Sequence, residues 1–133
     1  MKLSEIEGIG PAFEKKLKSA GITSVENLLE KGASAKGRKQ IAESTEIDAT
    51  RILEWVNRAD LFRIKGIGSE FSDLLEAAGV DSVPELSRRK PESLTKKLEE
   101  VNAEKKLVRR TPSLSMVENW VAQAKKLPKV VTH

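Results

Sequence analysis

The sequence predicts an all-α protein made of two similar halves, and three observations lead to that prediction. The pentapeptide Ile6–Gly10 recurs as Ile64–Gly68, and in each copy the next glycine follows eleven residues later. Apolar residues recur at helical spacing along most of the chain, and no stretch shows the alternation of a half-buried strand. Glycine and proline stand only where helices are expected to begin or end.

The repeat extends beyond the glycines. Residues 6–28 align with residues 64–86 without a gap, and eleven of the 23 pairs are identical. Identity of this extent at one fixed spacing indicates an internal duplication. We therefore expect one repeat over residues 1–60 and a second over residues 61–133, packed together as one compact helical domain.

Local signals place the helices of the first half. Pro11 suits the first turn of a helix, because its missing N–H would have no partner there, and Gly21 supplies the left-handed residue that ends the helix. Thr23–Glu26 has the pattern of a capping box, which opens a second helix. A short helix is expected over Lys36–Glu43, and Asp48 can cap a longer one. The residues expected to face inward are Phe13, Leu17, Ala20, Val25, Leu28, Leu29, Ile52, Leu53, Val56 and Ala59.

The second half repeats this order and ends differently. Gly79 is expected to end the helix that follows the second pentapeptide, and Ser82–Glu85 to open the next one. Pro91 can start a long helix, Pro112 breaks the chain, and Ser113 can cap the last helix. The residues expected to face inward are Phe71, Leu75, Ala78, Leu94, Leu98, Val101, Val117, Trp120, Val121, Ala124 and Leu127.

The positive charge is concentrated in the last third of the chain. The whole chain carries a net charge of +4. Residues 1–60 hold ten basic and ten acidic side chains, residues 61–87 hold two and five, and residues 88–133 hold twelve and five. The cations of the last segment form either one basic patch for a polyanion or a set of ordinary solvated helix faces.

Several classes of function are disfavoured by composition. The chain has no cysteine and a single histidine, His133, so disulfides, thiolate metal sites and histidine-based catalysis are not expected. No nucleophile–base pair can be recognised, and we expect no enzymatic activity, metal or cofactor. No apolar run reaches the length of a membrane span and no signal-type start is present, so we expect a cytoplasmic protein without a membrane partner.

The repeated pentapeptide has the composition of a tight turn before a helix. Glycine tolerates positive φ and lets another backbone approach closely. We expect Ile9 and Ile67 to plug the turn into the core, and the following helix to direct its unpaired N–H groups outward, where they can bind an anion. Trp55 and Trp120 lie among inward-facing aliphatic residues, so we expect them to pack in the core and not to stack on bases.

These turns resemble the helix-hairpin-helix motif of DNA repair and recombination proteins. Over nearly its whole length, including Lys36–Lys39, Trp55, Asp60-Leu61 and the Arg109-Arg110 region, the chain also resembles an uncharacterised bacterial family. That family is classed as a domain of unknown function and is built on tandem repeats of the motif. The resemblance implies a non-enzymatic module that grips the sugar–phosphate backbone of nucleic acid, DNA in particular, without reading its sequence.

The motif implies which residues would contact phosphate. Copy two carries Glu70 and Asp73 where copy one has Ala12 and Lys15, and carboxylates there satisfy the helix dipole and repel phosphate. The first hairpin is therefore expected to be the better phosphate binder. The nucleic-acid-binding residues implied are Gly8, Ile9, Gly10, Ala12, Lys15, Lys16, Gly66, Ile67, Gly68, Arg109 and Arg110.

Two other readings stay open at this point. In the first, the hairpins are purely structural and the chain is a protein–protein interaction or scaffold domain, as the acidic second hairpin and the uncharged first half suggest. In the second, a groove between the halves holds a small ligand, although the sequence names none.

Overall fold

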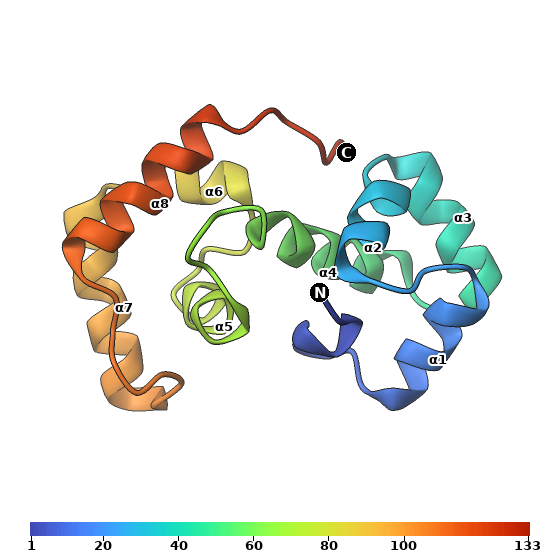
Figure 1. Cartoon of the computed structure of the whole chain (residues 1–133), viewed down its shortest axis with the longest axis horizontal. Coiled ribbons are helices and arrows are strands. Elements are labelled where there is room, and N and C mark those ends of the chain that lie inside the picture. The colour runs from blue at the N-terminus through green and yellow to red at the C-terminus, as the bar shows by residue number, and fades with distance from the viewer. The chain divides into compact units, whose positions relative to one another are not determined.

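The structure, a computed structural model, describes all 133 residues and is entirely helical (Figure 1). A short 3₁₀ helix, Leu3–Glu5, precedes eight α-helices. In chain order these are α1 Pro11–Ser19, α2 Val25–Gly32, α3 Ala35–Thr45, α4 Ala49–Leu61, α5 Ser69–Ala77, α6 Val83–Ser87, α7 Pro91–Lys105 and α8 Leu114–Lys126. The expected all-α class is therefore confirmed.

The chain divides into two compact units. Unit 1 consists of Met1–Asp60 together with Lys129–His133, and unit 2 consists of Leu61–Pro128. The sequence analysis assigned the last five residues to the second half, and the structure places them in unit 1 instead. There Val131 is buried and the Thr132 N–H donates to the Ala33 carbonyl at 2.8 Å. Nothing local in the sequence of this segment indicates that return.

Side-chain caps set where several helices begin. The predicted cap at Ser113 is present, and so is the one at Ser82, whose hydroxyl accepts from the Glu85 N–H at 3.3 Å. The capping box expected from Thr23 begins one residue later, because the Ser24 hydroxyl accepts from the Asn27 N–H at 3.1 Å. The Asn27 side-chain oxygen in turn accepts from the Thr23 N–H. Ser34 caps α3 in the same way. Helix α3 is longer at both ends than the short helix expected over Lys36–Glu43.

Each unit has its own apolar core. In unit 2, α8 packs against both α6 and α7, and α7 also contacts α5. In unit 1, α3 packs against α1 and α2. The buried apolar residues of unit 1 are Leu3, Ile6, Ile9, Leu17, Ile22, Val25, Leu28, Ile41, Ile47, Ile52, Trp55, Val56, Ala59 and Val131. Those of unit 2 are Leu61, Ile64, Ile67, Leu74, Leu75, Ala78, Val80, Val83, Leu86, Leu94, Leu98, Val101, Val108, Val117, Trp120, Val121 and Ala124.

The two units share local geometry at equivalent positions. Helices α1 and α5 both have nine residues, and each is followed by a glycine with positive φ, +85° at Gly21 and +93° at Gly79. Helices α4 and α8 both have thirteen residues. The connections before them differ, since three residues separate α3 from α4 and eight separate α7 from α8. No helix has both the length and the apolar character that crossing a bilayer requires.

Candidate nucleic-acid interface

The two repeated pentapeptides form turns with an equivalent hydrogen bond and an equivalent glycine at positive φ. The Ile9 N–H donates to the Ile6 carbonyl at 3.1 Å, and the Ile67 N–H donates to the Ile64 carbonyl at 3.2 Å. Gly8 has a φ of +95° and Gly66 a φ of +100°. A side chain is strained at such a φ, so the first glycine of each turn is required by the backbone itself.

A tryptophan indole lies against the first glycine of each turn. A Cβ built on Gly8 would lie 3.3 Å from Trp55 Nε1, and one on Gly66 would lie 2.9 Å from Trp120 Nε1. Trp55 and Trp120 are only 4% and 2% exposed, which confirms their expected role in core packing. Each indole also contacts a phenylalanine of the following helix: the ring centroids of Phe13 and Trp55, and of Phe71 and Trp120, are 5.2 Å apart. The turn and the start of the helix are thus held by one aromatic pair.

At the second glycine of each turn, neither the backbone conformation nor a neighbouring side chain requires glycine. Gly10 and Gly68 are the N-caps of α1 and α5, with extended backbone at φ −85° and −100°. No atom lies within 4 Å of a Cβ built at either position. No side chain caps either helix, although serines cap four others. The outer amides at these helix starts therefore have no side-chain acceptor, and in α1 they are those of Ala12 and Phe13 because Pro11 has no N–H.

In unit 1, the predicted basic residues lie beside this helix start. Ala12, Lys15 and Lys16 are exposed. Side chains on a helix lean toward its N-terminus, which favours a position of the lysine side chains near the turn that begins at Pro11. A shallow depression of about 490 Å³ borders the same turn, lined by Pro11, Glu14, Lys15, Lys18 and Ser19. Glu14 places one carboxylate in the first turn of α1, which reduces the expected contrast with copy two.

Arg51 adds a cation that the sequence analysis missed. Its guanidinium carbon lies 5.1 Å from the centroid of the Phe13 ring, and Phe13 is the third residue of α1. Such a cation–π contact holds the charge near the uncapped helix start. The spacing in the sequence could have indicated this position. Arg51 precedes Trp55 by four residues, so both lie on the helix face that packs near the turn.

In unit 2, the equivalent helix start is flanked by charges of both signs. Gly66, Gly68 and Glu70 are exposed, and Glu70 lies in the first turn of α5. Arg109 lines the same depression of about 510 Å³ as Glu70, and Arg110 is exposed. The turn itself is held from α8, because the Gln123 side chain accepts from the Lys65 N–H at 2.9 Å and donates to the Lys65 carbonyl at 3.1 Å.

Two of the predicted contact residues cannot use their side chains. Ile9 and Ile67 are each only 4% exposed, as expected for residues that plug the turn into the core. Their contribution to any contact is therefore limited to backbone atoms.

The buried Arg38 is excluded from any basic patch. Its guanidinium donates to the Gly32 carbonyl at 2.8 Å, to the Ala33 carbonyl at 3.0 Å and to the Thr132 carbonyl. Burial lowers the pKa of this guanidinium, but arginine stays protonated in proteins. Arg38 thus closes the end of α2 and holds the chain terminus in unit 1.

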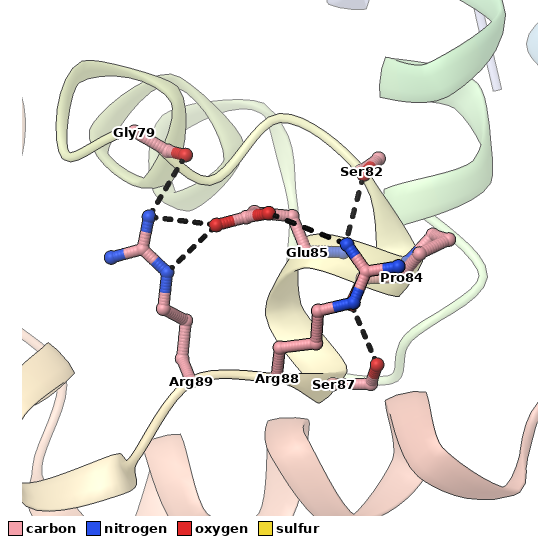
Figure 2. A network of polar contacts seen from close by, with 7 residues as sticks. All are labelled: Gly79, Ser82, Pro84, Glu85, Ser87, Arg88 and Arg89. Carbon is pink, nitrogen blue, oxygen red and sulfur yellow. Dashed lines mark hydrogen bonds and ion pairs between the residues drawn. The ribbon is translucent and has the colours of Figure 1, made fainter.

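The positive charge of the adjacent residues Arg88, Arg89 and Lys90 is also partly neutralised. Arg89 Nε donates to Glu85 Oε1 at 3.0 Å, and Arg89 Nη2 donates to the Gly79 carbonyl at 3.2 Å (Figure 2). Arg88 Nη1 lies 3.9 Å from the other oxygen of Glu85. Arg89 therefore stabilises the end of α5, where the helix dipole favours a cation.

The structure therefore gathers the predicted residues into two groups. Gly8, Gly10, Ala12, Lys15 and Lys16 are all exposed and lie in the turn before α1 or in its first two turns, in unit 1. Gly66, Gly68 and Arg109 lie near the start of α5 in unit 2. Each group combines an uncapped helix start with neighbouring cations, and only the first is without a carboxylate at the second helical position.

Fold and turns together define an all-helical protein with two units, each built around a glycine turn that a buried tryptophan supports. The chain belongs to the family described as Domain of unknown function (DUF4332), whose model matches residues 7–127. No curated protein and no solved structure matches the chain.

Proposed function

We propose that the protein is a non-enzymatic module that binds the sugar–phosphate backbone of DNA without sequence preference. In this proposal the two glycine turns are helix-hairpin-helix elements, and the turn before α1 makes the main contact. The amides of Gly10 and Ala12, on either side of Pro11, would bind a phosphate, and Lys15, Lys16 and Arg51 would surround it.

The observation that carries the proposal is the glycine at positions 10 and 68. Neither backbone conformation nor neighbouring atoms require glycine there. A serine, as used at four other helix starts of this chain, would fit and would satisfy an amide. Glycine instead leaves the helix start open to an anion that approaches from outside, which is how helix N-termini bind phosphate.

The electrostatics favour unit 1 over unit 2. At α1, the carboxylate of Glu14 lies beyond the first three helical residues, whereas at α5 the carboxylate of Glu70 occupies the second. Three cations that meet phosphates give a slope of about −3 for log K against log salt. Binding of this kind is sequence-independent, with dissociation constants of roughly 10⁻⁴–10⁻⁶ M at physiological salt.

A salt titration with fluorescently labelled duplex DNA tests the proposal. In the double variant Gly10→Asp/Lys15→Glu we expect the affinity at low salt to fall at least about ten-fold, because both changes oppose a phosphate. Aspartate is a good N-cap, so α1 should keep or gain stability and loss of binding cannot be attributed to unfolding.

The matched control is Gly68→Asp/Lys65→Glu, which makes the same glycine change and the same change of net charge at the turn of unit 2. We expect this control to bind DNA nearly as well as the original chain. The proposal is wrong if the original chain does not bind at low salt, or if the unit 1 variant binds as well as the original.

A protein–protein scaffold is the second candidate function. It is supported by the arginines that serve internal contacts, Arg38 and Arg89, and by the carboxylate of Glu70 in the first turn of α5. A complex that survives nuclease treatment and high salt would favour this function, while a complex lost on nuclease treatment would favour DNA binding.

A further inference from the structure

Unit 2 carries a surface loop that unit 1 lacks. In unit 1 the connection from α3 to α4 is Glu46–Asp48, and in unit 2 the connection from α7 to α8 is Lys106–Ser113. Both begin with a left-handed residue, Glu46 at φ +59° and Lys106 at φ +52°. The connection in unit 2 is therefore five residues longer than the one at the equivalent place in unit 1.

The longer loop is held in a defined conformation. The Asn102 side chain donates to the Val108 carbonyl at 3.0 Å and accepts from the Val108 N–H at 2.9 Å. Val108 and Pro112 are buried. Residues between and beside these anchors are thus presented to solvent on a rigid support, which lowers the entropy lost when they bind.

The presented surface is both apolar and basic. Of the four large hydrophobic residues that the chain exposes, Leu107 lies in the loop at 38% exposure, and Leu114 and Met116 follow it in the first turn of α8 at 40% and 38%. No acidic residue occurs between Glu104 and Glu118, whereas Lys105, Lys106, Arg109 and Arg110 are all exposed. Nucleic acid would use the cations but would leave the apolar side chains without a partner.

A depression gives this surface a place for an apolar group. It has a volume of about 510 Å³, and Ala103, Lys106, Leu107, Val108 and Arg109 line it together with Asn102 and Glu70. The depression is lined by one carboxylate, Glu70, and two cations, Lys106 and Arg109, and the exposed Lys105 and Arg110 are their neighbours in sequence. The depression thus offers apolar contact inside a positive field.

We propose that the loop Lys106–Ser113 docks an acidic, amphipathic segment of a partner protein. An apolar side chain of that segment enters the depression beside Leu107, and its carboxylates pair with Lys106, Arg109 and Arg110. Burial of apolar surface supplies affinity, and the complementary charges supply orientation and rate of association. This site is separate from the turn before α1 and does not depend on DNA binding there.

A pair of model peptides tests the chemistry with the full chain. The first is an amphipathic helix of about 18 residues with leucines on one face and glutamates elsewhere. The second has the same composition scrambled so that no apolar face forms. Amide chemical shifts of the labelled protein report where each peptide binds. We expect the first peptide to shift residues of the loop and to bind about ten-fold more tightly than the second.

Two variants at exposed residues separate the apolar contribution to the affinity for the peptide from the ionic contribution. Leu107→Ser should weaken the amphipathic peptide roughly ten-fold. Arg109→Gln/Arg110→Gln should weaken it and flatten its salt dependence. The matched control, Lys96→Gln/Lys97→Gln, removes the same charge from the exposed surface of α7 and should change the affinity less than about two-fold.

Three outcomes would overturn the proposal. They are equal binding of the two peptides, shifts confined to residues outside the loop, and no binding of the amphipathic peptide at low salt. A duplex DNA probe that shifts the same loop residues more strongly than the peptide would assign the surface to nucleic acid instead. Retained circular dichroism of each variant shows that any loss concerns the surface and not the fold.

Discussion

Single glycines divide into those that the fold needs and those that it does not. Gly8 and Gly66 combine positive φ with a neighbouring indole nitrogen, whereas Gly10 has an ordinary extended backbone and open space. The backbone of the turn therefore requires glycine at position 8 but not at position 10.

We predict opposite stability effects at the two kinds of glycine. Gly66→Ala should lower the free energy of unfolding by about 1–2 kcal/mol through left-handed strain alone, with more from the 2.9 Å approach to Trp120 Nε1. Gly10→Ser should change it by less than about 0.5 kcal/mol and in the stabilising direction. Urea unfolding followed by tryptophan fluorescence measures both, and equal stability of the two variants would contradict the assignment.

At the scale of elements, polar side chains hold helix ends and loops that apolar packing leaves open. Arg38 closes the end of α2 by donating to three backbone carbonyls, and Asn102 fixes the loop after α7 by bonding both polar groups of Val108. Both contacts replace water at backbone groups that are partly or fully buried, so their loss leaves those groups unsatisfied.

Removal of the Arg38 guanidinium should destabilise unit 1. Arg38→Met keeps the aliphatic stem and deletes the donors, and we expect a loss of about 3 kcal/mol in the free energy of unfolding. Lys39→Met, at the exposed neighbouring position, should change stability by less than about 0.5 kcal/mol. Amide exchange at Gly32–Ser34 would locate the effect, and unchanged protection there would show that the guanidinium is dispensable.

Removal of the Asn102 amide should loosen the loop without unfolding unit 2. Asn102→Ala is expected to cost about 1–2 kcal/mol locally, because two part-buried hydrogen bonds are lost. Exchange of the Val108 amide should accelerate while amides of Leu94–Leu98 keep their protection. If Val108 exchanges at its original rate, the side chain does not hold the loop.

At the scale of the whole molecule, the end of the chain returns to unit 1. Val131 is 6% exposed, and Thr132 contacts Ala33 and Arg38. Unit 1 is therefore complete only when the chain beyond α8 is present, and unit 2 lies between its two segments in sequence.

Truncation after Pro128 tests this arrangement. We expect unit 1 to lose about 2–4 kcal/mol of stability, since one buried valine and its neighbouring hydrogen bonds are removed. Amide protection should fall in α2 and α3 and persist in α7 and α8. Deletion of His133 alone serves as the control and should have little effect. Equal loss of protection in both units would mean that the tail does not belong to unit 1 specifically.

The sequence by itself determined the helical class, most helix boundaries and the positions of both turns. Pro11, Gly21, Ser82 and Pro91 act through their own backbone preferences and their immediate neighbours, so their effect can be read locally.

Only the tertiary structure decided which polar groups are free to act. Arg38 lies between two lysines in the sequence, yet it is buried among carbonyls that include one 94 residues away. Arg51 has no local feature that sets it apart from other basic residues, yet it lies over Phe13, in the first turn of α1. These roles arise from contacts between distant segments, and no local preference of the chain encodes them.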